Sequence, residues 1–339
     1  MIYLQKKPNY RKMEAIKLNN QLSKSKQIVD IITQNITSGK YKRGDIIPSI
    51  NQASKLFNVS RDTIFKAYNE LKSLGTIESS PTKGYYVANE VKKILLLLDT
   101  YSPYKYELFN ALQKELPTNC KVDLYFHQYS ESRFNRFVQE SAGRYNTYLV
   151  MNYKDNVYSE MLNILDQSKV MLLDFGEFEK ERFSYACQNF TEAFYDCMVT
   201  GYPFLSKYKK IVLVYPVDTE HPSSILAYFK KYCSDYGFPF EIVPALKDKD
   251  VNKGTAYLII RHSDLLDFIK MTRARHLTIG KDLGVFAYND EPVFEILENG
   301  ITTISIDFRE IGKIAAEFVR TGKRQQVYVP TKFTSRGSL

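Results

Sequence analysis

The sequence predicts an α/β protein in which an N-terminal winged helix-turn-helix is followed by a larger, two-lobed domain with parallel sheets. Three observations predict this: helical periodicity up to residue 74 followed by a hairpin pattern, alternation of strands and helices after residue 93, and positive charge concentrated near the N-terminus. A chain of 339 residues is long enough for two or three domains. We expect a basic arm at residues 1–21, the winged helix-turn-helix at 22–88, a linker at 89–93 and the larger domain at 94–339.

The net charge of +9 is unevenly distributed along the chain. Residues 1–90 contain 15 Lys and Arg against 7 Asp and Glu, whereas the remaining residues contain 32 against 31. A local excess of this kind predicts a polyanionic partner for the N-terminal part alone. A solvated basic tail is the alternative, which the helical pattern of residues 44–74 disfavours.

Residues 44–74 have the pattern of two short helices joined by a tight turn. Ser49 follows a proline and caps a first helix that runs to about Phe57, in which apolar residues recur every three or four positions. Ser60 caps the second helix, whose first turns carry polar and basic residues of the kind that a recognition helix presents to a major groove. These outward residues are Arg61, Thr63 and Lys66. A plain helical hairpin with solvated Arg and Lys is the alternative.

A further helix and a hairpin flank this pair. Residues 27–36 have an amphipathic pattern that Gly39 closes, and residues 75–87 predict two short strands around a basic tip between Pro81 and Gly84. Three helices followed by a hairpin with a basic tip make a winged helix-turn-helix.

Five short motifs in this region resemble the DNA-binding domain of GntR-type transcription regulators. They are I-x-x-G before a basic turn, G-D-x-x-P-S, V-S-R-x-T, A-Y-x-x-L-x-x-x-G, and a glycine wing that ends in an aromatic residue and Val. Each motif is weak alone, but the five occur in order at the right spacing over residues 22–88. The resemblance implies that this domain binds double-stranded operator DNA.

The resemblance and the outward pattern of the second helix together give a set of candidate DNA-binding residues. The family's usual Glu-Arg pair after P-S is replaced by Ile50 and Asn51, and Thr82 stands where the wing usually has its first glycine. We therefore expect an operator that differs from the commonest family pattern. The candidates are Ser49, Asn51, Ser60, Arg61, Thr63 and Lys66 on the helices, and Lys83, Gly84 and Tyr85 in the wing.

From residue 93 onward, apolar strands alternate with amphipathic helices, from KILLLLDT to FREIGKIAAEFVR. This alternation predicts parallel sheets with helices on both faces, arranged as two halves in tandem with a cleft between them. A helix is expected at residues 158–167, and the last helix, at 308–320, is expected to belong to the second half. In such sheets ligands bind at the carboxyl ends of the strands.

The run VFAYND and the segment PVFEILENGITTISIDFREIGKIAAEFV that follows resemble the closing segment of LacI- and GalR-type sugar-sensing domains. These domains are similar to periplasmic sugar-binding proteins. The T-T-x-x-x-D-x-x-x-x-G-x-x-A-A pattern is matched from Thr302 to Ala316, whereas the first half of the domain matches only in its rhythm of strands and helices. The resemblance implies a two-lobed, periplasmic-binding-protein-like fold with a small-molecule effector, a sugar or a sugar derivative.

A sugar site needs planar hydrogen-bonding groups and aromatic faces in a cleft. Asp290 is the strongest candidate, because it matches a family position whose carboxylate accepts hydrogen bonds from sugar hydroxyls or purine groups. For the other candidates, packing of a Tyr or a satisfied lone His is the alternative, and about half of the set is expected to contact a ligand. The full set is Tyr101, Tyr104, Asn152, Asp174, Phe175, Asn189, Tyr215, His221, Asp264, Asn289 and Asp290.

Several classes of function are disfavoured by the sequence. There is no Walker loop, no G-x-S-x-G and no Gly-rich setting for a pyridoxal phosphate lysine, so we expect neither an enzyme nor a cofactor. The cysteines lack C-x-x-C spacing and neighbouring His residues, which predicts reduced thiols and no metal site. The absence of a signal core or a membrane-length apolar run predicts a cytoplasmic protein without a membrane partner.

These expectations combine into a homodimer that reads a near-palindromic operator and responds to an effector closing the cleft. The alternative from another class is a ligand-independent architectural DNA-binding protein, whose larger domain only dimerises.

Overall fold

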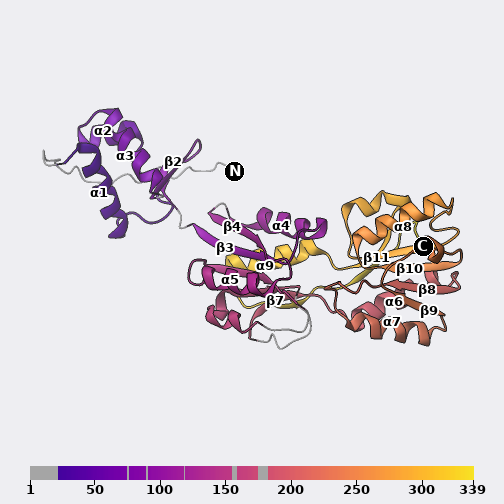
Figure 1. Cartoon of the computed structure of the whole chain (residues 1–339). Helices are drawn as coiled ribbons and strands as arrows, with labels where there is room; N and C mark the ends of the chain where they lie inside the picture. Colours follow the sequence, from indigo (N-terminus) through magenta and orange to yellow (C-terminus); the bar gives the residue numbers. More distant parts are fainter. Residues whose placement is uncertain (1–21, 75, 89–90, 118, 155–158, 175–181) are drawn as a thin grey trace, which may run out of the picture. The chain divides into compact units, whose positions relative to one another are not determined.

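The computed structural model describes residues 22–74, 76–88, 91–117, 119–154, 159–174 and 182–339 (Figure 1). The chain divides into two compact units, residues 1–91 and 92–339. The expected basic arm at residues 1–21 and part of the expected linker lie outside the described residues.

The first unit is a three-helix bundle with a two-stranded hairpin. Its apolar positions recur at three- and four-residue spacing, so one face of each helix is buried in a shared core that includes Ile28, Ile32, Ile64 and Tyr68. This arrangement confirms the predicted winged helix-turn-helix. The elements are α1 (Lys24–Thr37), α2 (Ile50–Phe57), α3 (Arg61–Ser73), β1 (Ile77–Ser80) and β2 (Gly84–Val87).

Local sequence signals set the bounds of the two central helices. Ser49 caps α2 in a capping box, because its hydroxyl accepts from the Gln52 amide while the Gln52 side chain accepts from the Ser49 amide. Asn58 ends α2 in the left-handed conformation, with φ 52°. Ser60 then caps α3 by accepting from the amide of Thr63.

The larger unit begins with a lobe built on a six-stranded sheet in the order β13-β7-β6-β5-β3-β4, in which all paired strands are parallel. Strand β3 lies between β5 and β4 and is buried over residues 94–98, as its continuous apolar run predicts. The strands are β3 (Lys92–Leu98), β4 (Cys120–Phe126), β5 (Thr147–Met151), β6 (Val170–Leu173), β7 (Ser184–Cys187) and β13 (Gln326–Tyr328). The helices of this lobe are α4 (Pro103–Glu115), α5 (Glu131–Ser141) and α9 (Phe308–Thr321).

The second lobe has a six-stranded sheet in the order β14-β12-β11-β10-β8-β9, with β14 antiparallel to β12. Its strands are β8 (Lys210–Val214), β9 (Phe240–Val243), β10 (Thr255–Ile259), β11 (Gly284–Tyr288), β12 (Thr302–Ser305) and β14 (Lys332–Thr334). Its helices are α6 (Glu192–Leu205), α7 (Ser224–Asp235) and α8 (His262–Ala274). The two lobes confirm the predicted fold class.

The lobes are not two halves in tandem, and the expectation for the last helix was wrong. Helix α9 follows β12 of the second lobe but packs on α4 in the first, as Figure 1 shows for the yellow helix among the magenta elements. The approach is close, because a Cβ atom added at Gly312 would lie 2.4 Å from the carbonyl oxygen of Leu108. The chain therefore passes between the lobes after β7, after β12 and after β13.

The prediction of a helix at residues 158–167 was also wrong. The described part forms two short 3-10 helices, Glu160–Ile164 and Gln167–Lys169. Asp166 accepts from the amide of Ser168 and thereby starts a new turn, which competes with continuation of a helix. Strands β7, β13 and β14 were not predicted, because they are short and carry mixed polar residues.

Among the described residues, no helix combines the length and apolar composition needed to cross a bilayer.

Candidate functional site

The start of α3 holds the candidate DNA-binding side chains in defined positions. Ser60 and Thr63 are held together, with 2.8 Å between their hydroxyl oxygens and 3.2 Å from the Thr63 amide to the Ser60 oxygen. Arg61 and Lys66 are exposed on the helix surface. The arrangement leaves two basic side chains beside a helix N-terminus, which itself favours anions such as phosphate.

The start of α2 and the wing carry the other candidates. Ser49 is committed to the capping box, and Asn51 is exposed on the first turn of α2. Lys83 and Gly84 are exposed at the wing tip, where Gly84 has φ 74° and pairs with Ser80. Tyr85 differs from these, because its ring packs edge-on against the buried Tyr68 with 4.8 Å between centroids. The half-buried ring of Tyr85 therefore packs the wing against α3.

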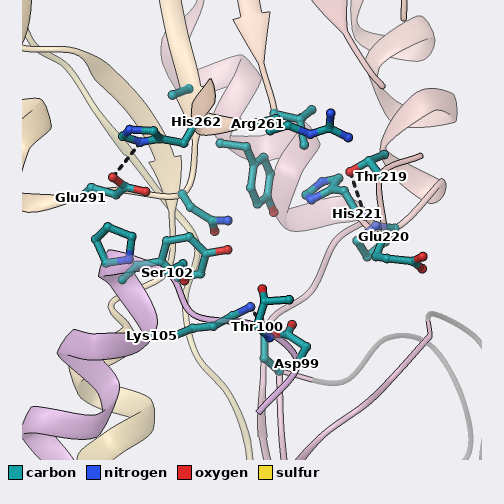
Figure 2. Close-up of a pocket in the computed structure, with 18 of the residues that line it drawn as sticks. Asp99, Thr100, Ser102, Lys105, Thr219, Glu220, His221, Arg261, His262 and Glu291 are labelled. Carbon is teal, nitrogen blue, oxygen red and sulfur yellow. Dashed lines mark hydrogen bonds and ion pairs between the residues drawn. The ribbon is translucent and has the colours of Figure 1, made fainter. Parts of the chain in front are cut away.

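A cleft with a cavity volume of about 520 Å³ lies between the two lobes of the larger unit. This volume is within the range typical of small-molecule sites. Its walls come from the carboxyl ends of β3, β5, β6, β10 and β11 and the segments that follow them, as expected for parallel sheets. In Figure 2, Asp99 and Lys105 lie on one side of the cavity, and Arg261 and His262 lie on the other.

The cleft brings together part of the set predicted from the sequence. The predicted residues that line it are Tyr101, Tyr104, Asn152, Asp174, His221 and Asn289. Those that do not line it are Asn189, Tyr215, Asp264 and Asp290. Phe175 lies outside the described residues.

Asp290, the strongest candidate from the sequence, is bound to another part of the chain. Arg336 donates to both of its carboxylate oxygens, at 2.9 Å and 2.7 Å, and also donates to the carbonyl of Ile301 at 2.7 Å. A bidentate pair of this kind uses the acceptor positions that a ligand would need. The geometry thus gives Asp290 a role in holding the C-terminal segment, and the expected ligand contact is not supported.

The residue before Asp290, Asn289, lies on the wall of the cleft. Its backbone is left-handed, with φ 66°, a conformation that Asn tolerates better than most residues. Its side-chain oxygen is buried and has no hydrogen-bond partner among the described residues. A buried, unsatisfied acceptor on the wall of a cavity is a position where a ligand hydroxyl would restore a lost hydrogen bond.

Three other predicted residues have structural partners that explain their absence from the cleft wall. Asn189 accepts from the amide and the hydroxyl of Thr191, at 2.8 Å and 2.7 Å, and so fixes the start of α6. Tyr215 donates its hydroxyl to the carbonyl of His221 at 2.6 Å and supports that residue from behind. Asp264 lies on the first turn of α8 and accepts from the hydroxyl of Ser263 at 3.4 Å.

His221 forms part of an aromatic wall. Its ring centroid lies 4.4 Å from that of Tyr288 and 5.6 Å from that of Phe190. Burial lowers the pKa of His221 to about 3, so the imidazole is neutral at physiological pH. Its Nε2 atom is buried without a partner among the described residues, which leaves it available to hydrogen-bond a ligand.

The first lobe contributes a buried polar network that the sequence did not reveal. Lys105 is 3% exposed and binds the carboxylate of Asp99, which also accepts from the hydroxyl of Tyr129 at 3.1 Å. Burial acts to lower the pKa of Lys105, but nearby Tyr104 and Asp99 outweigh this and hold the pKa above its usual value. The lysine therefore stays charged and neutralises the carboxylate of Asp99 on the wall of the cleft.

A hydrogen-bonded chain crosses from one lobe to the other beside the cleft. Gln188, which directly follows β7, donates to Asp174 of the first lobe at 2.7 Å. It accepts from the hydroxyl of Tyr288, at the end of β11, at 3.3 Å. Burial, and then the charge of Asp174, raise the pKa of Tyr288, so its hydroxyl remains a donor.

The second lobe adds charged pairs at the other wall. Arg261 binds Asp218 at 2.6 Å, and Nδ1 of His262 lies 2.8 Å from a carboxylate oxygen of Glu291. Glu291 is 4% exposed, and burial raises its pKa. Within the described residues, no group of three or more His, Cys, Asp or Glu side chains is arranged to hold a metal ion.

Comparisons with known proteins agree with both halves of this architecture. Residues 24–87 match the family model described as bacterial regulatory proteins, gntR family, and residues 206–339 match the periplasmic binding protein-like domain. The chain joins a GntR-type helix-turn-helix domain to a periplasmic-binding-protein-like domain. Both resemblances drawn from the sequence are thus confirmed at the level of the domains.

The curated relatives, which are HTH-type transcriptional regulators, match only a part of this chain. The uncharacterized HTH-type transcriptional regulator YcxD of Bacillus subtilis is 33% identical over 72 residues, which are 21% of this chain and 16% of the relative. YhcF of the same organism, also an uncharacterized HTH-type transcriptional regulator, is 28% identical over 103 residues, 29% of this chain and 85% of the relative. The chain thus spans only about a sixth of YcxD.

Solved structures resemble the periplasmic-binding-protein-like domain in fold. The trehalose repressor from Escherichia coli superposes with a TM-score of 0.60 at 16% identity, covering 72% of this chain and 100% of that one. A LacI family transcriptional regulator from Lactobacillus casei with bound sucrose gives 0.60 at 13% identity, covering 73% and 100%. At such identities the likeness concerns the fold alone.

Some cleft residues of this domain were missed by sequence reasoning. They are Asp99, Lys105, Tyr129, Gln188, Phe190, Arg261, His262, Tyr288 and Glu291. Asp99 directly follows the predicted strand β3, so a polar residue at that strand end was a usable signal, whereas Glu291 lies three residues beyond the end of β11. No local pattern marks Lys105, which lies inside a helix.

Proposed function

We propose that this protein is a transcription regulator that binds operator DNA through its GntR-type domain and a small-molecule effector in the inter-lobe cleft. The observation that carries the proposal is the pairing of an exposed, basic helix start with a cleft that buries unsatisfied polar atoms. Neither feature contributes to the stability of its domain, since exposed charges contribute little and unsatisfied polar atoms cost free energy.

For the DNA, we propose two-fold symmetric recognition of a near-palindromic operator by a homodimer. Arg61 and Lys66 at the start of α3 would enter the major groove, and Lys83 at the wing tip would contact the backbone or the minor groove. The positive balance of residues 1–90 supports such a partner, because neutralised phosphates supply most of the sequence-independent affinity.

For the effector, we propose a sugar or a related polyhydroxy molecule without a phosphate group. Asn289 and His221 offer hydrogen-bonding atoms, and Tyr288 and Phe190 offer ring faces. Two of the cations that line the cleft, Lys105 and Arg261, already bind carboxylates. Further carboxylates, which include Asp174, Glu220 and Glu291, also line it, so a phosphate dianion would meet net repulsion.

Effector binding would act on DNA affinity through closure of the lobes. The hydrogen bonds of Gln188 to Asp174 and to Tyr288 join the two lobes. Gln188 lies on a segment where the polypeptide crosses from one lobe to the other. A ligand that binds the closed arrangement more tightly shifts the population towards it, by a coupling free energy of about 1 to 3 kcal/mol in typical cases.

A thermal-shift screen of the full chain against monosaccharides, disaccharides and their phosphates tests this proposal. A ligand at about 100 times its dissociation constant should stabilise the protein by about 2.7 kcal/mol. Tighter binding of a sugar phosphate than of its parent sugar would contradict the charge argument. Stabilisation by no member of the panel would favour the view that the larger domain only dimerises.

Two adjacent residues provide a matched pair of variants for any ligand found in this screen. Asn289→Gly removes the proposed contact while preserving the left-handed backbone, and we expect at least a tenfold loss of affinity. Asp290→Ala breaks the pair with Arg336, so it should lower thermal stability and change ligand affinity much less. The reverse outcome, measured by titration calorimetry, would restore Asp290 as the ligand contact.

A further inference from the structure

Phe65 occupies an unusual place for a large aromatic residue. It lies on the second turn of α3, and its side chain is 51% exposed, whereas Ile64, Ala67 and Tyr68 on the same helix are fully buried. Full burial of a Phe side chain is strongly favourable, and much of that gain is forgone here. Its exposure therefore excludes a role in the core of the helix bundle.

The ring lies on the same side of α3 as the candidate DNA-binding residues. Residues four apart share one face of a helix, so Arg61, Phe65 and Asn69 form one stripe, and all three are exposed. Lys66 is its exposed neighbour. Among the residues that the structure describes, the Phe65 ring has no aromatic or cationic partner, so the stripe presents one apolar group between polar and basic ones.

An apolar ring can distinguish only one feature of the major groove. The edges of guanine, cytosine and adenine show hydrogen-bond donors and acceptors there, whereas thymine adds a 5-methyl group that contacts residues such as Phe. We propose that Phe65 contacts a thymine methyl group and makes one position of each operator half-site specific for thymine. This inference rests on the proposed DNA-binding function and adds the base class that α3 recognises.

The test uses duplexes that the full-length protein selects from a random library. Each thymine of the best duplex is replaced in turn by deoxyuridine, which removes only the methyl group. Burial of one such group corresponds to about 0.8 kcal/mol, or about a fourfold change in affinity. We expect a threefold to tenfold loss at one thymine per half-site for the wild-type protein, measured by fluorescence anisotropy at fixed salt.

Two variants connect this loss to Phe65. Phe65→Ala should bind the thymine duplex as weakly as the wild type binds the deoxyuridine duplex, and it should no longer distinguish the two. Phe65→Leu, which remains apolar, should retain part of the discrimination. The matched control is Leu74→Ala, which removes another exposed apolar side chain, at 63% exposure, just beyond the end of the same helix. It should retain the wild-type response to deoxyuridine.

The outcomes separate this inference from the function on which it rests. If the wild-type protein selects no duplex at all, the proposed function itself is wrong. If it selects an operator that is insensitive to deoxyuridine at every thymine, or if Phe65→Ala keeps the full wild-type sensitivity, the inference is wrong and the DNA-binding function stands. A loss of dimerisation in Phe65→Ala without a change in base preference would instead assign the ring to a protein contact.

Discussion

The GntR-type domain and the inter-lobe cleft hold their functional candidates in opposite ways. On α3, Arg61 and Lys66 are exposed and depend little on the fold for their charge. In the cleft, Lys105 is 3% exposed and is held by Asp99 and its neighbours. Recognition and stability are therefore separable on an exposed helix face, whereas they are coupled in a buried cleft.

The largest expected effect comes from breaking the buried pair in the cleft. Lys105→Met leaves the Asp99 carboxylate without its cation, and removal of one partner of a buried pair typically costs about 3 to 5 kcal/mol. The chain has no Trp, so unfolding is followed by circular dichroism in urea and by calorimetry of the full chain. The transition of the larger domain should shift to lower urea and lower temperature.

The control for this variant is Lys313→Met, which breaks an exposed pair with Glu310 on α9. Exposed pairs contribute about 0 to 1 kcal/mol, so this variant should be close to the wild type. Equal losses of stability in the two variants would show that the buried pair contributes no more to stability than an exposed pair. That result would contradict the contrast between the cleft and the exposed face of α3.

The same contrast explains which features could be predicted from the sequence. The caps Ser49 and Ser60, the apolar spacing of α2 and α3 and the wing are determined by residues close together in the chain, so the winged helix-turn-helix was predictable down to the starts of α2 and α3, whereas α1 begins three residues before its expected start. The alternation of strands and helices likewise predicted two parallel lobes. Each of these features depends on local propensity and periodicity.

The cleft was less predictable because it depends on contacts between distant segments. Helix α9 was assigned to the wrong lobe, since its amphipathic pattern shows that one face is buried but does not show against which lobe. Asn289 and Asp290 are adjacent, and the left-handed backbone of Asn289 together with the distant Arg336 decides which one faces the cleft. Gln188 joins residues 14 and 100 positions away, which no local pattern reveals.

A smaller effect is expected from the exposed face of α3. If Arg61 pairs with a guanine edge, Arg61→Ala should weaken operator binding by about 1 to 3 kcal/mol and relax base preference at one position. The thermal unfolding of the protein should change by less than about 0.5 kcal/mol, because the side chain is exposed. Binding titrations against a full set of single-base operator variants measure both quantities.

Two results would contradict this prediction. An Arg61→Ala protein with unchanged base preference would remove Arg61 from the set of base contacts. An Arg61→Ala protein that loses stability and DNA affinity together would show that the separation between recognition and stability does not hold on α3.

The smallest expected effect is a pH dependence of stability that arises in the cleft. The pKa of His221 is about 3 in the folded protein and about 6.5 when unfolded, so the unfolded chain binds more protons between these values. The contribution of neutral His221 is therefore fully present above about pH 6.5 and is lost as the pH falls. Between pH 7.5 and pH 5.5 the free energy of unfolding of the wild type should fall by about 1.4 kcal/mol more than that of His221→Gln, as measured by urea unfolding at each pH.

A second buried histidine, His127, whose pKa burial lowers to about 4, contributes equally to both proteins. The control is His276→Asn at an exposed position, which should keep the wild-type pH dependence. A His221→Gln protein with the same dependence would show that the folded protein protonates His221 as readily as the unfolded chain does, so that burial does not hold the imidazole neutral.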